Sequence, residues 1–136
     1  MNRTEAKARI RSHLKKKGDE ICVVSEFMVM FWWRLLNNAV FCGKLREPKR
    51  IELRNFHGDT LGWCKPYGRT KQRDVSIGMR REYDDRITFL TVLAHEMVHQ
   101  YEWHTGRAMT HGQRFYEWEN KVKHAVGLPL NEYVEI

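Results

Sequence analysis

One stretch of the chain, DDRITFLTVLAHEMVHQYEW (residues 84–103), constrains the fold most, because its apolar residues recur with a helical period around HEMVH. At about 100° per residue, His95 and His99 lie roughly 40° apart on one helix face, so both imidazoles can point at a single ion. Glu96 projects to the side of that ion, where its carboxylate can act as a general base on a metal-bound water. We therefore predict a half-buried helix that carries two metal ligands toward a cleft.

A catalytic zinc site takes a third protein ligand and leaves the fourth position to water. His104 belongs to the end of the same helix and cannot easily fold back onto the ion. Glu117 and Glu119 lie in a later segment, HGQRFYEWENKVKHAV (residues 111–126), and of these Glu119 remains the runner-up or a partner of a ligand. His111 is the stronger candidate, because it opens that segment on the face that must pack inward. This face also carries Phe115, Trp118 and Val122.

Composition indicates a single domain, since 136 residues with 42% hydrophobic content provide one core and little more. The most apolar run, residues 27–36, is interrupted by Arg34 and is shorter than the roughly 20 residues of a membrane-spanning helix. The N-terminus lacks the apolar core and cleavage site of a secretory signal peptide. The cysteines are odd in number and have no CxxC spacing, which favours a reducing, cytoplasmic setting, in a bacterial cell or a phage-infected host. They are Cys22, Cys42 and Cys64.

Positive charge is concentrated in the first 18 residues, where seven cations face one glutamate and account for six of the formal net charge of +7. We expect residues 1–18 to form a basic arm that contacts nucleic acid through phosphates, or else a solvated leader without a partner. Ala6, Ile10 and Leu14 recur every four residues and predict a short amphipathic helix in this arm. The candidate nucleic-acid contacts are Arg3, Lys7, Arg9, Arg11, Lys15, Lys16 and Lys17.

Besides the arm and the 111–126 segment, two more helices are predicted, and the sequence indicates their boundaries. A strongly apolar helix is predicted from residue 23 to about Gly43, because glycine suits the left-handed position just past a helix C-terminus. The HEMVH helix has Asp84 or Asp85 placed to cap its start, and Gly106 follows its end.

Alternating patterns predict a small sheet between these two helices. RIELRNF (residues 50–56) and RDVSIGMR (residues 73–80) alternate apolar and polar residues, and each predicts a strand with one buried face. The turn-rich stretch between them contains Leu61 and Trp63, which indicates a third short strand. The fold class is therefore α+β, with an antiparallel or mixed sheet.

The paired motifs LAHEMVHQY and HGQRF resemble the HExxH…HGxxF signature of the SprT-like (Spartan-type) zinc metallopeptidases. Upstream, LLNNAVFCGKLREPKRIEL is similar to the family's entry helix and first strand, and TLGWC to a further strand, so the resemblance covers approximately residues 24–124. It implies a zincin-like fold with an N-terminal helix, a small three-stranded sheet, the HExxH active-site helix and a following C-terminal helix. Residues 19–136 would then form the metallopeptidase domain.

The resemblance also implies site residues. It assigns Zn2+ to His95, His99 and His111, and the catalytic base to Glu96. The C-terminal zinc-binding module of some bacterial members and the partner-binding tails of Spartan have no counterpart in this sequence, so the targeting that those parts supply is not implied.

Three classes of function compete. The first is a zinc endopeptidase that acts as a monomer on protein substrates, either proteins bound or crosslinked to DNA or the targets of a phage or bacterial regulatory protease without DNA dependence. The second is a zinc nuclease with three patterned histidines, which fails because Thr105 occupies the third position. The third is a non-catalytic, zinc-containing nucleic-acid-binding module, which usually needs four protein ligands. For the peptidase, the candidate oxyanion donors are Tyr101, His104, Arg114 and Tyr116.

Overall fold

The computed structural model describes residues 2–15, 20–56, 58–69 and 71–130 of the chain. Within these residues the helices are α1 (Arg3–Lys15), α2 (Glu26–Phe41), α3 (Arg86–His104) and α4 (Gln113–Val126). The strands are β1 (Cys22–Val23), β2 (Arg50–Arg54), β3 (Gly62–Pro66), β4 (Val75–Arg80) and β5 (Glu82–Tyr83). The predicted α+β class is confirmed, with an N-terminal helix, a three-stranded sheet, the HExxH helix and a following helix.

The three-stranded sheet has the order β2-β4-β3 and is mixed, since β4 runs parallel to β2 and antiparallel to β3. The expectation of a single buried face is wrong for β4, because this central strand is buried on both faces. Val75, Ile77 and Met79 are fully buried in the core. On the opposite face Gly78 pairs with Trp63 of β3, and the indole ring occupies the space beside the glycine.

Helix α2 begins later than the sequence pattern predicted. Ser25 caps it by accepting a hydrogen bond from the Met28 backbone NH, and the helix starts at Glu26. The preceding residues, Cys22 and Val23, instead form β1 and pair with β5, a two-stranded sheet that the periodicity did not reveal. The predicted start at residue 23 was therefore wrong, because a side-chain cap and a strand pairing override the apolar spacing.

The end of α2 lies where a left-handed residue was expected. The helix stops at Phe41, and both Cys42 and Gly43 adopt positive φ values of 55° and 73°. The Gly43 backbone NH donates to the Asn37 carbonyl, which satisfies a carbonyl that the ended helix leaves open.

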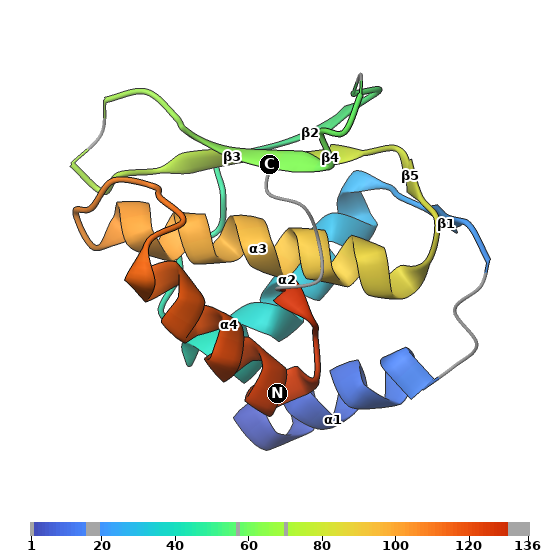
Figure 1. Ribbon diagram of the computed structural model, residues 1–136. Coiled ribbons are helices and arrows are strands. Elements are labelled where there is room, and N and C mark those ends of the chain that lie inside the picture. Colours follow the sequence, from blue (N-terminus) through green and yellow to red (C-terminus); the bar gives the residue numbers. More distant parts are fainter. Residues whose placement is uncertain (1, 16–19, 57, 70, 131–136) are drawn as a thin grey trace.

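Helix α3 lies at the centre of the molecule, between the sheet and the other three helices (Figure 1). Asp85 caps its start by accepting from the Thr88 backbone NH. Every residue from Phe89 to Gln100 is buried, so the prediction of a half-buried helix was wrong. The sequence pattern misled because packing on all sides hides polar residues as well as apolar ones.

A buried amide fixes α3 against its surroundings. Gln100 is completely buried; its side-chain oxygen accepts from the Trp33 indole NH of α2 at 3.0 Å. Its amide nitrogen donates to the Arg46 carbonyl at 2.7 Å. Both ends of the amide are therefore satisfied, and the helix is tied to α2 and to the connection that follows it.

The predicted amphipathic helix of the basic arm forms as α1 and packs against the domain. Ala6 and Ile10 are completely buried. The Arg3 guanidinium donates to the Ala39 carbonyl of α2, and that of Arg11 donates to the His124 carbonyl of α4. The predicted domain boundary after residue 18 falls among residues that the structure does not describe. No described helix has the length and apolar character needed to cross a membrane.

We expect Gly78→Ala to lower the free energy of unfolding by about 1–3 kcal/mol, because the added Cβ would overlap ring atoms of Trp63. Urea denaturation of both proteins measures the difference. The same substitution should cost clearly less in a Trp63→Ala background, where the obstructing ring is gone. Equal costs in the two backgrounds would show that the steric conflict is not the cause.

Candidate metal centre

Three histidine side chains converge at the C-terminal half of α3. His95 and His99 are buried on α3, and half-buried His111 approaches from the connection between α3 and α4. The Nε2 atom of His111 lies 3.0 Å from that of His99 and 3.2 Å from that of His95. One ligand atom from each residue lies within 4.8 Å of the others, so this group can hold a metal ion.

His111 reaches the group from a position that differs from the predicted one. Helix α4 begins at Gln113 with Gly112 as its N-cap, so His111 precedes the helix instead of lying on its inward face. The extended backbone of Gly112, with φ −83° and ψ −167°, turns the chain before the helix starts. The predicted helical position was therefore wrong, although the structure does bring the side chain to the other two histidines.

Phe115 forms an apolar wall against the three histidines. Its ring centroid lies 4.7 Å from that of His95, 5.1 Å from that of His99 and 4.9 Å from that of His111. The side chain is only 1% exposed. The spacing of HGxxF thus places the histidine just before α4 and its apolar support, Phe115, in the first turn of that helix.

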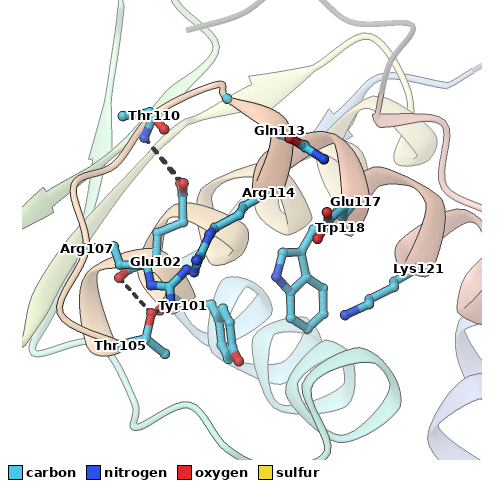
Figure 2. A pocket seen from close by; sticks show the side chains of 11 residues that line it. Tyr101, Glu102, Thr105, Arg107, Thr110, Gln113, Arg114, Glu117, Trp118 and Lys121 are labelled. Atoms are coloured by element: carbon cyan, nitrogen blue, oxygen red, sulfur yellow. Dashed lines mark hydrogen bonds between the residues drawn. The ribbon is translucent and has the colours of Figure 1, made fainter.

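Glu102 is a site residue that the sequence reasoning missed. Its buried carboxylate lies 2.7 Å from Nδ1 of His99, and it also accepts from the Thr110 backbone NH at 3.4 Å (Figure 2). Burial raises the pKa of Glu102, while the Thr110 NH and the nearby His111 oppose that rise. The available signal was spacing, since a residue three positions after His99 lies on the same helix face.

The Glu102 contact selects the form of His99 that can bind a metal. When Nδ1 donates to a carboxylate, the proton of the neutral ring resides on Nδ1, and the lone pair of Nε2 is available. That nitrogen faces Nε2 of His111 at 3.0 Å. A carboxylate behind a ligating histidine also fixes the ring orientation and raises its basicity.

The donor set fits a zinc-type ion. Three mutually facing ring nitrogens cannot all be satisfied by shared protons, because each neutral ring carries only one. Tetrahedral zinc with Zn–N bonds of about 2.0–2.1 Å would hold its nitrogens about 3.3 Å apart, close to the observed 3.0 and 3.2 Å. Burial, followed by the neighbouring His99 and His111, lowers the pKa of His95 to about 3, so its ring is neutral at ordinary pH.

Glu96 lies beside the histidines but outside the group that can hold the ion. It is 2% exposed, and its Oε2 atom has no hydrogen-bond partner in the described part of the chain. Burial raises its pKa to about 8. β3 approaches this residue closely at Gly62, where a Cβ would stand 3.7 Å from Cγ of Glu96 and 2.9 Å from Val92. A buried, unsatisfied carboxyl with a raised pKa is a candidate functional group.

The other candidate ligands lie outside the converging group in the described residues. His104 is half-buried at the end of α3, Glu117 is exposed and Glu119 is half-buried on α4. Of the candidate oxyanion donors, Tyr101 packs against Phe41 and Trp118. The remaining donors, Arg114 and Tyr116, are exposed on α4.

Five of the seven basic residues of the arm lie on α1. Arg9 and Lys15 are exposed, as are Arg3 and Arg11, whose guanidiniums donate to carbonyls of the domain. Lys7 is half-buried. Lys16 and Lys17 lie outside the described residues.

The chain also matches the model of a known protein family. The model of the SprT-like family matches residues 31–134, which includes α3, α4 and all three histidines. The chain belongs to the SprT-like family. The domain is therefore of the metallopeptidase-like SprT type, as the paired motifs indicated. No curated protein and no solved structure matched the chain.

His111→Ala should abolish tight zinc binding, because two nitrogens from one helix leave the ion with too few protein ligands. His104→Ala is the matched control and should retain about one zinc per chain, since His104 lies outside the converging group. Metal analysis of the dialysed proteins measures both. The opposite ranking would remove His111 from the site.

Glu102→Ala should weaken zinc affinity by about 10- to 100-fold without abolishing it, because the ligands remain while the support of His99 is lost. Competition with a chromogenic chelator measures the affinity. The exposed Glu117→Ala on α4 provides the control and should leave affinity unchanged. An unaltered affinity in Glu102→Ala would mean that the carboxylate does not support the ligand.

Proposed function

We propose that the chain is a zinc-dependent endopeptidase in which His95, His99 and His111 hold the ion and Glu96 is the general base. The observation that supports this most strongly is the pairing of two features in one buried place. Three ring nitrogens converge on a point, and a fourth protein group, the Glu96 carboxyl, lies next to them without joining the ligand set. A ligand set of three leaves a coordination position open for water or substrate.

A bound zinc ion would polarise the scissile carbonyl and lower the pKa of water toward roughly 7. Glu96 takes the proton from the attacking water and passes it to the departing amine. A carboxyl whose pKa burial raises to about 8 is well matched to this exchange near neutral pH. His99 is held in its ligating tautomer by Glu102, and Phe115 keeps water from the inner side of the three rings.

The sheet offers a place for the substrate backbone. β3 is an edge strand of the β2-β4-β3 sheet, so its outer edge faces no other described strand (Figure 1). The strand also packs against α3. An extended peptide can add to such an edge through main-chain hydrogen bonds. Since β3 approaches Glu96 at Gly62, a peptide bound along this edge would pass close to the general base.

The alternative of a non-catalytic zinc module is less well supported. A structural zinc site usually has four protein ligands, whereas the converging group in the described residues has three. A structural site also gives no role to a buried, unsatisfied glutamate beside the ligands. We therefore favour the peptidase, and we extend the proposal to proteins bound to DNA as its substrates.

Glu96→Gln should retain about one zinc per chain and lose protein cleavage by at least about a hundredfold, because the amide cannot accept the water proton. Cleavage of a fluorescently labelled unfolded protein, with metal analysis of the same sample, measures both properties. Glu117→Gln is the control, since this glutamate is exposed on α4, and it should cleave normally. Undiminished cleavage by Glu96→Gln would refute the role of base, and joint loss of zinc would assign Glu96 to the ligand set.

A further inference from the structure

His111 reaches the metal centre from a connection whose residues are mostly exposed. This connection joins α3 to α4 and spans residues 105–112. Residues 105–108 are exposed, and Met109 packs partly buried against the core. A segment with few buried apolar contacts opens locally at a lower free energy than the core does. The position of His111 therefore depends on the polar contacts that hold this connection in place.

Arg73 contacts the 105–112 connection from the segment that follows β3. It belongs to the connection from β3 to β4, whose described residues are 67–69 and 71–74. Its Nε atom donates to the Trp103 carbonyl, and its Nη2 atom donates to the Arg107 carbonyl at 3.3 Å. Its guanidinium carbon lies 3.6 Å from the Trp103 ring centroid, which is a cation–π contact. Both connections lie at the same end of α3 (Figure 1).

The backbone at Arg73 is held in a conformation that residues with a Cβ rarely adopt. Its φ is 54°, in the left-handed region. The residues on either side are anchored, since the Gln72 carbonyl accepts from the Arg46 guanidinium. The Asp74 carbonyl accepts from the Tyr67 backbone NH at 2.9 Å. A strained residue persists only where surrounding contacts determine its conformation, and here they hold the side chain toward the end of α3.

The carbonyls that Arg73 engages lie on the path of the chain to His111. Arg107 is held on both sides, because its backbone NH donates to the Glu102 carbonyl at 3.0 Å and its carbonyl accepts from Arg73. Three residues later, the Thr110 backbone NH meets the Glu102 carboxylate at 3.4 Å. Arg73 thus secures the first half of the connection, and Glu102 secures the residue next to His111.

We propose that Arg73 is a positioning residue for the metal centre. Its contacts with Trp103 and Arg107, which we call the Arg73 clamp, hold the connection that delivers His111. Without the clamp this connection opens more often, and His111 leaves the ligand set with it. The clamp also ties β3, the strand proposed to bind substrate, to the segment that carries the third ligand. The inference rests on the ligand set of the proposed function but requires no cleavage.

Two simpler roles for Arg73 predict different outcomes. If its positive charge alone mattered, its removal would favour a bound cation, so zinc would leave more slowly. If Arg73 only stabilised the fold, its loss would act like any other destabilising substitution, and zinc release would follow overall stability. The clamp predicts faster release that is specific to the 105–112 connection.

The test measures the rate at which the zinc-loaded chain releases zinc to an excess of a chromogenic chelator. Arg73→Ala should release zinc about three- to tenfold faster, a smaller effect than the roughly 10- to 100-fold loss of affinity typical when a direct partner of a ligand is removed. Arg73→Lys keeps a cation and a donor and should lie between the two. Lys71→Ala is the matched control, because Lys71 is an exposed cation two residues away, and its release rate should change by less than about twofold.

Two further variants separate the clamp from backbone strain and from overall stability. Arg73→Gly relieves the left-handed conformation, yet it should release zinc as fast as Arg73→Ala does. Gly78→Ala places its steric conflict in β4, against Trp63, and should release zinc at the unaltered rate. Hydrogen exchange of the metal-free proteins should be faster at residues 105–110 in Arg73→Ala, with α2 unchanged.

An unchanged release rate in Arg73→Ala, or an equal acceleration in Lys71→Ala, would overturn the inference. Normal release by Arg73→Gly would do so as well, since it would assign the effect to the backbone. Equal acceleration in Gly78→Ala would assign it to overall stability instead. A chain that takes up no zinc would contradict the proposed ligand set, and exchange at residues 105–110 would still decide whether Arg73 holds the connection.

Discussion

The arrangement of the three histidines depends on the contacts of the buried Glu102 carboxylate. It joins two parts of the chain that no secondary structure connects, because it accepts from the ring of His99 on α3 and from the backbone of Thr110 in the following loop. The first contact fixes the tautomer of one histidine, and the second places the loop that delivers His111. A single side chain thus determines both the chemical form and the position of the donors.

His95, Glu96, His99 and Glu102 are buried, and burial requires that polar groups be satisfied within the protein. Gln100, also on α3, is paired at both ends of its amide, and His99 is paired through Glu102. Glu96 differs, since one of its oxygens is buried without a described partner. Leaving a carboxyl in this state costs stability. Such a cost is typical of a group kept ready for proton transfer, which agrees with the role proposed for it.

Much of the fold could be predicted from sequence, because local signals and packing agree over most of the chain. The helical period of α3, the left-handed end of α2 and the alternation in β4 were all readable. The three histidines that the structure brings together were also the metal ligands predicted from the sequence. Some errors come from contacts between distant segments, and others from local caps that override the apolar spacing. The periodicity could not indicate that Cys22 and Val23 pair with β5.

The same limit applies to the site. Glu102 was overlooked because its importance comes from Thr110, and only the folded loop brings that NH to the carboxylate. His111 was placed on a helix because apolar spacing continues from it, whereas Gly112 ends that continuity with an extended backbone.

The contacts of α1 and α2 with α4 have a consequence for the order of events during synthesis. A ribosome releases α1 and α2 first, yet Phe41 of α2 is covered by Trp118 of α4, and Arg11 of α1 reaches the carbonyl of His124. These surfaces therefore stay uncovered until α4 has been synthesised. The wall formed by Phe115 arrives at the same late stage. Because His111 follows α3 in the chain, the three histidines converge only after the start of α4 has been made, and a shorter nascent chain would hold no assembled cluster.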